Sequence, residues 1–124
     1  MTMSTMQFEG QCVFNEGDSF IFNTFRITER GDILVEISGD SITDRYSLTC
    51  RLQKENGRYS GCGVIEYSGN KSIRTDTVFL SIQESYISFS DDICMIKRGQ
   101  WELKTPDGSE IYYFSGELER IMAD

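Results

Sequence analysis

The strictest constraint in this sequence is an alternation of apolar and polar residues between positions 42 and 53. Its apolar side carries Ile42, Tyr46, Leu48, Cys50 and Leu52. A period of two is expected of a strand that has one face buried and the other in water. The Asn56-Gly57 pair that follows favours a type I′ hairpin turn, because both of its residues adopt positive φ readily. We therefore expect residues 42–53 to pair antiparallel with residues 58–67.

Glycines inside the expected strands indicate that the sheet curves. An aromatic-x-Gly triplet occurs three times, as Phe8-Glu9-Gly10, Tyr59-Ser60-Gly61 and Phe114-Ser115-Gly116. A glycine within a strand has no side chain to pack and usually marks a bulge, a bend or a close approach of another backbone. A change of parity at Arg98-Gly99 further predicts a β-bulge.

Other extended runs bring the expected total to eight or nine strands. These runs cover residues 6–14, 19–28, 33–37, 73–83, 86–90, 93–104 and 110–118. Turn signals every ~8 to 14 residues are typical of a sandwich or barrel, and short connections place sequence neighbours side by side in the sheet. We predict one all-β domain over residues 1–124, an antiparallel up-and-down meander curled into a small barrel. A half-open barrel and a β-sandwich are the alternatives.

The Gly99-Gln100-Trp101 segment, with the length and the order of hairpins, resembles lipocalin and avidin-type barrels, which carry a Gly-x-Trp motif. In lipocalins this motif lies on the first strand, whereas here it falls near the end of the chain and no Trp accompanies Gly10. The resemblance covers most of the chain and implies a calycin-like architecture. It assigns no functional residue in this sequence.

The side chain that most often serves as a general base or a metal ligand is missing from this chain. It contains no histidine, which excludes Ser-His-Asp triads, Cys-His pairs and His-based metal sites. Gly61-Cys62-Gly63 lacks the following Lys-Ser/Thr and the helix of a phosphate-binding loop. Asp91-Asp92 is interpreted as a solvated turn, because turns favour Asp. We therefore expect a protein that is not an enzyme and that uses no cofactor or metal.

The balance of acidic and basic residues limits the classes of partner that this protein is expected to bind. Acidic residues number 20 and basic residues 12, so the formal net charge is -8. Nucleic-acid binding needs clustered Lys and Arg, and the longest basic run is Lys97-Arg98, so no nucleic-acid partner is expected. No stretch approaches the ~20 consecutive apolar residues of a membrane-spanning helix. A negative field favours solubility and attracts basic partners.

The cysteines indicate whether the protein is found in a reducing or an oxidising compartment. Cys12, Cys50, Cys62 and Cys94 are widely spaced and form no C-x-x-C pair. We expect four buried free thiols in a reducing cytoplasm, since a free cysteine packs as a small hydrophobic residue. Two disulfides in an exported protein are the alternative.

A protein-protein inhibitor is the first function that fits these features. Such an immunity or antitoxin protein would cover the basic cleft of a nuclease or toxin with its acidic face. Tyrosine rings suit interfaces, and Tyr112 and Tyr113 are consecutive in a strand, so one should face outward. The candidate contact residues are Tyr112, Tyr86, Glu84, Asp91 and Asp92.

A carrier for a small apolar ligand is the alternative function. A barrel of about eight strands has an interior that side chains just fill or that holds one small ligand. Tyr46, Leu48 and Trp101 are the candidate residues for lining such a cavity.

Overall fold

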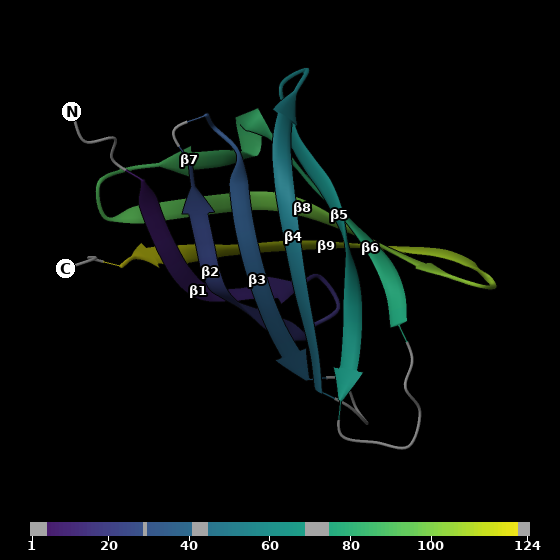
Figure 1. The fold of residues 1–124 in the computed structure, drawn as a ribbon. Coiled ribbons are helices and arrows are strands. Elements are labelled where there is room, and N and C mark those ends of the chain that lie inside the picture. Colours follow the sequence, from purple (N-terminus) through teal and green to yellow (C-terminus); the bar gives the residue numbers. More distant parts are fainter. Residues whose placement is uncertain (1–4, 29, 41–44, 69–74, 122–124) are drawn as a thin grey trace.

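The computed structural model describes residues 5–28, 30–40, 45–68 and 75–121, and in these parts it contains nine strands and one short 3-10 helix, η1 (Glu84–Tyr86) (Figure 1). The strands are β1 (Met6–Phe14), β2 (Ser19–Ile27), β3 (Ile33–Asp40), β4 (Arg45–Glu55), β5 (Arg58–Ser68), β6 (Thr75–Gln83), β7 (Ile87–Phe89), β8 (Ile93–Thr105) and β9 (Gly108–Arg120). The strand starts expected at Ile42 and Ile73 lie outside the described residues.

The strands form one antiparallel sheet that closes on itself. Strands β1 to β6 are neighbours in chain order, and β9 returns to pair with β1. Strand β8 pairs with β9 on one side and with β6 on the other, and this second pairing closes eight strands into a barrel. Strand β7 lies outside the ring and pairs with the beginning of β8. The predicted all-β, up-and-down barrel is confirmed.

The predicted alternation of apolar and polar residues lies on β4, as expected. Leu48, Cys50 and Leu52 are buried, and the residues between them are exposed. Strand β4 turns into β5 through Asn56 and Gly57, whose φ angles of 55° and 75° are those of the predicted hairpin turn.

The three aromatic-x-Gly glycines lie where another backbone comes very close. A methyl group on Gly10 or Gly116 would lie 2.8 or 2.6 Å from a carbonyl oxygen of the neighbouring strand, and one on Gly61 would overlap the carbonyl oxygen of Arg51. The predicted bends are therefore places where only a hydrogen fits. The register also slips between Phe8 and Gly10 in the β1–β2 pair, so the first of these bends is accompanied by a bulge.

The bulge expected at Arg98-Gly99 is also present. The register of β8 against β9 shifts between Ile96 and Gly99. This shift restores the alternation of inward and outward residues along β8. Gly99 is therefore buried against the Phe114 ring, and Trp101 faces the core.

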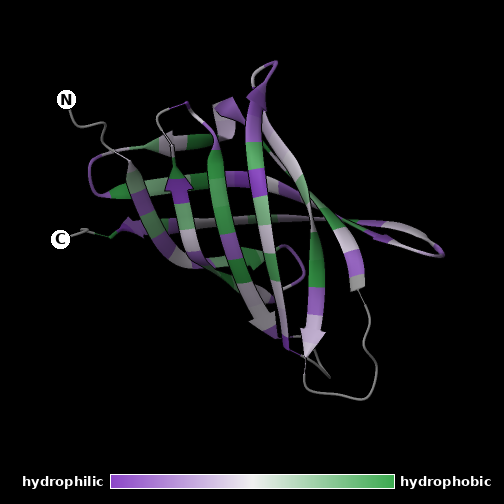
Figure 2. Ribbon diagram, in the orientation of Figure 1, coloured by the Kyte–Doolittle hydropathy of each residue, from purple (hydrophilic) through white to green (hydrophobic). Residues whose placement is uncertain are grey.

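The barrel interior is filled by apolar side chains, many of them aromatic. Figure 2 shows hydrophobic and hydrophilic residues following one another along the strands. The largest fully buried rings are Phe8, Phe20, Phe22, Phe25 and Phe114. Phe20 contacts both Phe22 and Phe114 with ring centroids 5.1 Å apart and edge-on geometry, which aromatic pairs favour. In the described part of the chain, no helix has the length and apolarity needed to cross a bilayer.

The four cysteines are free thiols, but one of them is not buried. Cys12, Cys50 and Cys94 lie in the core, and burial raises the pKa of both Cys12 and Cys94 to about 12. Cys62 is exposed, so the expectation that all four are buried was wrong for this residue. Its neighbours Gly61 and Gly63 occupy the inward positions of β5, and alternation therefore turns Cys62 outward.

We expect Gly61→Val to destabilise the barrel by about 1–3 kcal/mol, the usual cost of overpacking, because its Cβ has no space beside the Arg51 carbonyl. The free energy of unfolding in urea measures this. Ser60→Val is the matched control, since it adds the same branched side chain to the outer face one residue earlier and should change stability by less than about 0.5 kcal/mol. Equal stability of the two variants would contradict the assignment of Gly61 as a structural bend.

Candidate functional site

A pocket of about 200 Å³ lies at the end of the barrel where β1 finishes and β4 begins. We call it the end pocket. Its apolar and aromatic wall consists of Phe14, Tyr46, Ile65, Tyr67, Trp101, Leu103 and Tyr112. Three carboxylate residues, Glu16, Asp18 and Asp40, complete the lining.

The aromatic rings of the end pocket contact one another. Trp101 meets Phe14 at 5.3 Å between ring centroids, with the two rings perpendicular, and it meets Tyr46 at 6.3 Å. Phe14 also meets Tyr112 at 5.9 Å. Because Trp101 is only 4% exposed, it forms the floor of the pocket, and the other rings form its walls.

Two tyrosine hydroxyls of the end pocket are held by carboxylates. Tyr112 donates a hydrogen bond to Glu110, which lies two residues earlier on β9. Tyr67 donates to the Oδ2 atom of Asp76 at 3.1 Å, and Asp76 is 7% exposed. These hydrogen bonds fix the positions of the two hydroxyl groups.

The carboxylates make this end of the barrel electronegative. Burial, followed by the charges of Asp18, Tyr67 and Asp40, raises the pKa of Tyr46 to about 12. The hydrogen bond to Glu110 is the largest cause that raises the pKa of Tyr112, also to about 12. Both phenols are therefore neutral at physiological pH, and the negative charge of the pocket resides on its carboxylates.

A larger hollow of about 600 Å³ lies beside the end pocket and shares Asp18, Asp40 and Tyr46 with it. Asp40 pairs there with Arg45 at 3.5 Å, and both side chains are well exposed. Exposed ion pairs of this kind contribute little energy.

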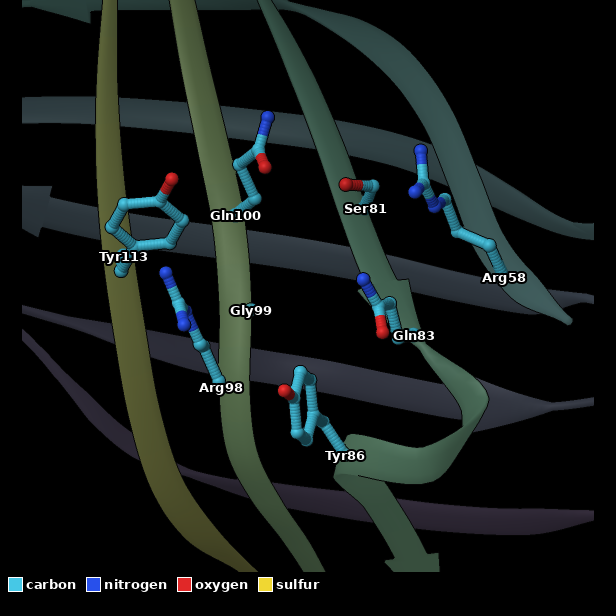
Figure 3. Close-up of a pocket in the computed structure, with 8 residues that line it drawn as sticks. All are labelled: Arg58, Ser81, Gln83, Tyr86, Arg98, Gly99, Gln100 and Tyr113. Carbon is cyan, nitrogen blue, oxygen red and sulfur yellow. The ribbon is translucent and has the colours of Figure 1, made fainter.

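A separate pocket of about 200 Å³ lies on the outer surface of β5, β6 and β8, beside β9 (Figure 3). We call it the outer pocket. It is lined by Arg58, Ser81, Gln83, Tyr86, Arg98, Gly99, Gln100 and Tyr113. Its side chains are polar, in contrast to the wall of the end pocket.

The residues predicted to line a carrier cavity are partly brought together. Tyr46 and Trp101 both line the end pocket. Leu48 is 2% exposed and belongs to the core.

The residues predicted to contact a protein partner are dispersed. Glu84 and Tyr86 lie in η1, where Glu84 forms an ion pair with Lys54. Asp91 and Asp92 lie in the turn before β8. Tyr112 lines the end pocket, so it does not share a surface with the others.

Other residues of both pockets were not predicted from the sequence. Phe14, Tyr67 and Leu103 occupy inward positions near strand ends. The alternation of inward and outward residues along each strand could have predicted that they face the end pocket. Arg58 and Arg98 are 40 positions apart in sequence, and only the pairing of β5 with β6 and of β6 with β8 brings their strands together.

Comparison with known proteins gives no match: no family model, no curated protein and no solved structure is significantly similar to this chain. Among the residues that the structure describes, no group of three or more Cys, Asp or Glu side chains is arranged to hold a metal ion.

The raised pKa of Tyr46 predicts a loss of stability in alkali. The unfolded chain releases the Tyr46 proton near pH 10, whereas the folded chain holds it to about 12. Deprotonation therefore favours the unfolded state in this window, and the free energy of unfolding should fall as pH rises through it. Urea unfolding of Tyr46→Phe between pH 9 and about 11 should show a shallower decline than wild type. The buried thiols are common to both proteins, so parallel curves would contradict the prediction.

Proposed function

We propose that this protein is a non-catalytic barrel that binds a small molecule in its end pocket. The observation that carries the proposal is the convergence of Phe14, Tyr46, Tyr67, Trp101 and Tyr112 around one cavity. Binding sites for small molecules are typically concave, apolar and aromatic, with a few polar groups that select the ligand. The end pocket combines these features.

The carboxylates support a more specific class of ligand. Glu16 and Asp18 lie at the pocket with no basic residue among its described lining. A ligand with a flat apolar body and a protonated amine would place its body against the rings and its charge near these carboxylates. Aromatic faces also attract cations, by about 0.5–2 kcal/mol. We therefore propose, as the ligand class, an amine that is protonated at neutral pH and carries a flat apolar group.

The proposal is tested with three probes that share one ring system and differ in charge: 1-naphthylmethylamine, 1-methylnaphthalene and 1-naphthylacetate. Calorimetry should give a saturable one-to-one complex, with the amine bound most tightly and the carboxylate most weakly. Because removing a charged partner weakens an interaction by about 1.5–3 kcal/mol, the Asp18→Asn variant should lose on the order of tenfold in affinity for the amine. No saturable binding of any of the three probes would contradict the proposal.

A pair of variants distinguishes binding in the end pocket from binding on the outer surface. Leu103→Trp fills the end pocket from β8 and should abolish binding. Lys104→Trp adds the same side chain to the exposed neighbouring position of β8 and should leave the affinity unchanged. Equal affinity in the two variants would place the ligand elsewhere.

The inhibitor function is a second candidate that a different observation favours. Ile93 and Met95 are 39% and 36% exposed on β8, opposite Glu119 and Glu117 of β9. Asp91 and Asp92 precede Ile93 in the turn. Exposed apolar side chains bordered by acidic ones suit a basic protein partner, since the apolar groups slow dissociation and the charges speed encounter. We call this surface the acidic face.

The salt dependence of the association rate tests whether the acidic face binds a basic protein. Association with a basic nuclease should slow steeply as salt rises from about 0.01 to 0.15 M, because the screening length falls from about 30 to 8 Å. The double variant Glu117→Gln/Glu119→Gln should associate more slowly than wild type. Glu55→Gln/Glu66→Gln removes the same charge from exposed positions of β4 and β5 and is the control. A panel of basic nucleases that shows no salt-dependent association would contradict this candidate.

A further inference from the structure

The outer pocket contains two arginines, Arg58 and Arg98, that take part in none of the ion pairs found among the described residues. The chain as a whole carries a charge of -8, yet none of the residues described as lining this pocket is acidic. The ion pairs found among the described residues engage Arg45, Arg51 and Lys54, and leave Arg58 and Arg98 out. Glu55 of β4 lies opposite Arg58, but the lining of the pocket itself carries two positive charges and no negative one.

The barrel holds these two arginines on opposite sides of one group of polar side chains. Arg58 of β5 lies opposite Gln83 of β6, and Ser81 of β6 lies opposite Gln100 of β8. Neighbouring strands are about 4.8 Å apart, so two steps separate the β5 and β8 backbones by roughly 10 Å. Figure 3 shows the serine and the two glutamines between Arg58 and Arg98, with the Arg98 side chain turned toward Tyr113 of β9.

The Tyr113 ring supports the guanidinium of Arg98. The guanidinium carbon lies 4.1 Å from the ring centroid. Stacking on a ring occupies the face of a guanidinium and leaves the N–H groups at its edge free to donate. On the other side, Tyr86 of η1 borders the same pocket. Arg58, Arg98, Gln83 and Gln100 thus place hydrogen-bond donors along the lining of one pocket that Tyr86 and Tyr113 also line.

We propose that the outer pocket binds a tetrahedral oxyanion, namely a phosphate group carried on a small organic molecule. Guanidinium N–H groups form short charge-assisted hydrogen bonds with phosphate oxygens. The glutamine amides and the Ser81 hydroxyl supply further donors. The Tyr86 and Tyr113 rings then contact the organic part of the ligand. This site lies on the outer surface and does not depend on the proposed function of the end pocket.

The test is a titration followed by the backbone amide resonances of Ser81, Gln83 and Gln100. Inorganic phosphate, phenyl phosphate and phenol are the three probes. Saturable binding of phenyl phosphate that is tighter than the binding of inorganic phosphate supports a phosphate ester as the ligand. Equal affinities of the two compounds support the free oxyanion as the ligand. No saturable shift with either phosphate compound would overturn the proposal, as would phenol binding as tightly as phenyl phosphate.

Charge variants locate the site. Arg98→Gln and Arg58→Gln should each weaken phenyl phosphate binding on the order of tenfold or more, because each removes charge-assisted hydrogen bonds. Arg26→Gln removes an exposed arginine from the outer face of β2 and should leave the affinity unchanged. Leu103→Trp, which fills the end pocket, should also bind phenyl phosphate normally. Equal weakening by Arg26→Gln and Arg98→Gln would mean attraction by overall charge and would overturn the site.

Discussion

The hydrogen bonding between β6 and β8 is the interaction on which the rest of this structure depends. It joins residues 77–81 to residues 100–104 and turns a nine-stranded meander into a closed ring of eight strands. Without it, both strands would present unpaired backbone groups along an edge, which is costly and promotes aggregation. Closure also gives each strand an inner and an outer face of different chemistry. The end pocket exists because there is an interior, and the outer pocket exists because β5, β6 and β8 have become neighbours.

The closure in turn requires backbones that approach closely at a few positions. Gly61 and Gly63 of β5 both lie against carbonyl oxygens of β4, and Gly116 of β9 lies against β1. At these positions a side chain would separate the strands and flatten the sheet. The aromatic residues then occupy the volume that the curved sheet encloses, and Phe20 and Trp101 meet at 5.3 Å between ring centroids. Glycines and large rings are therefore complementary: the first allow a narrow barrel and the second fill it.

Much of the fold was predictable because its signals are local. The alternation along β4, the Asn56-Gly57 turn and the parity change at Arg98-Gly99 each involve residues within a few positions of one another. The exposure of Cys62 was also available from local alternation, since Gly61 and Gly63 take the inward positions. The inward direction of Tyr112 was harder to predict, because it depends on how β9 pairs with β8 after a bulge. The outer pocket was beyond local reasoning, because it combines residues of β5, η1 and β8 that only closure brings together.

The total charge of the chain is a poor guide to what each surface attracts. At physiological salt the screening length is about 8 Å, so a ligand at the outer pocket experiences mainly Arg58 and Arg98 and only weakly the carboxylates of the end pocket. The same screening leaves Glu16 and Asp18 as the dominant charges at the barrel end. A net charge of -8 is therefore compatible with the cation site and the anion site that we propose. Because one faces the interior and the other the exterior, the barrel wall separates them, and each is open to substitution without loss of the other.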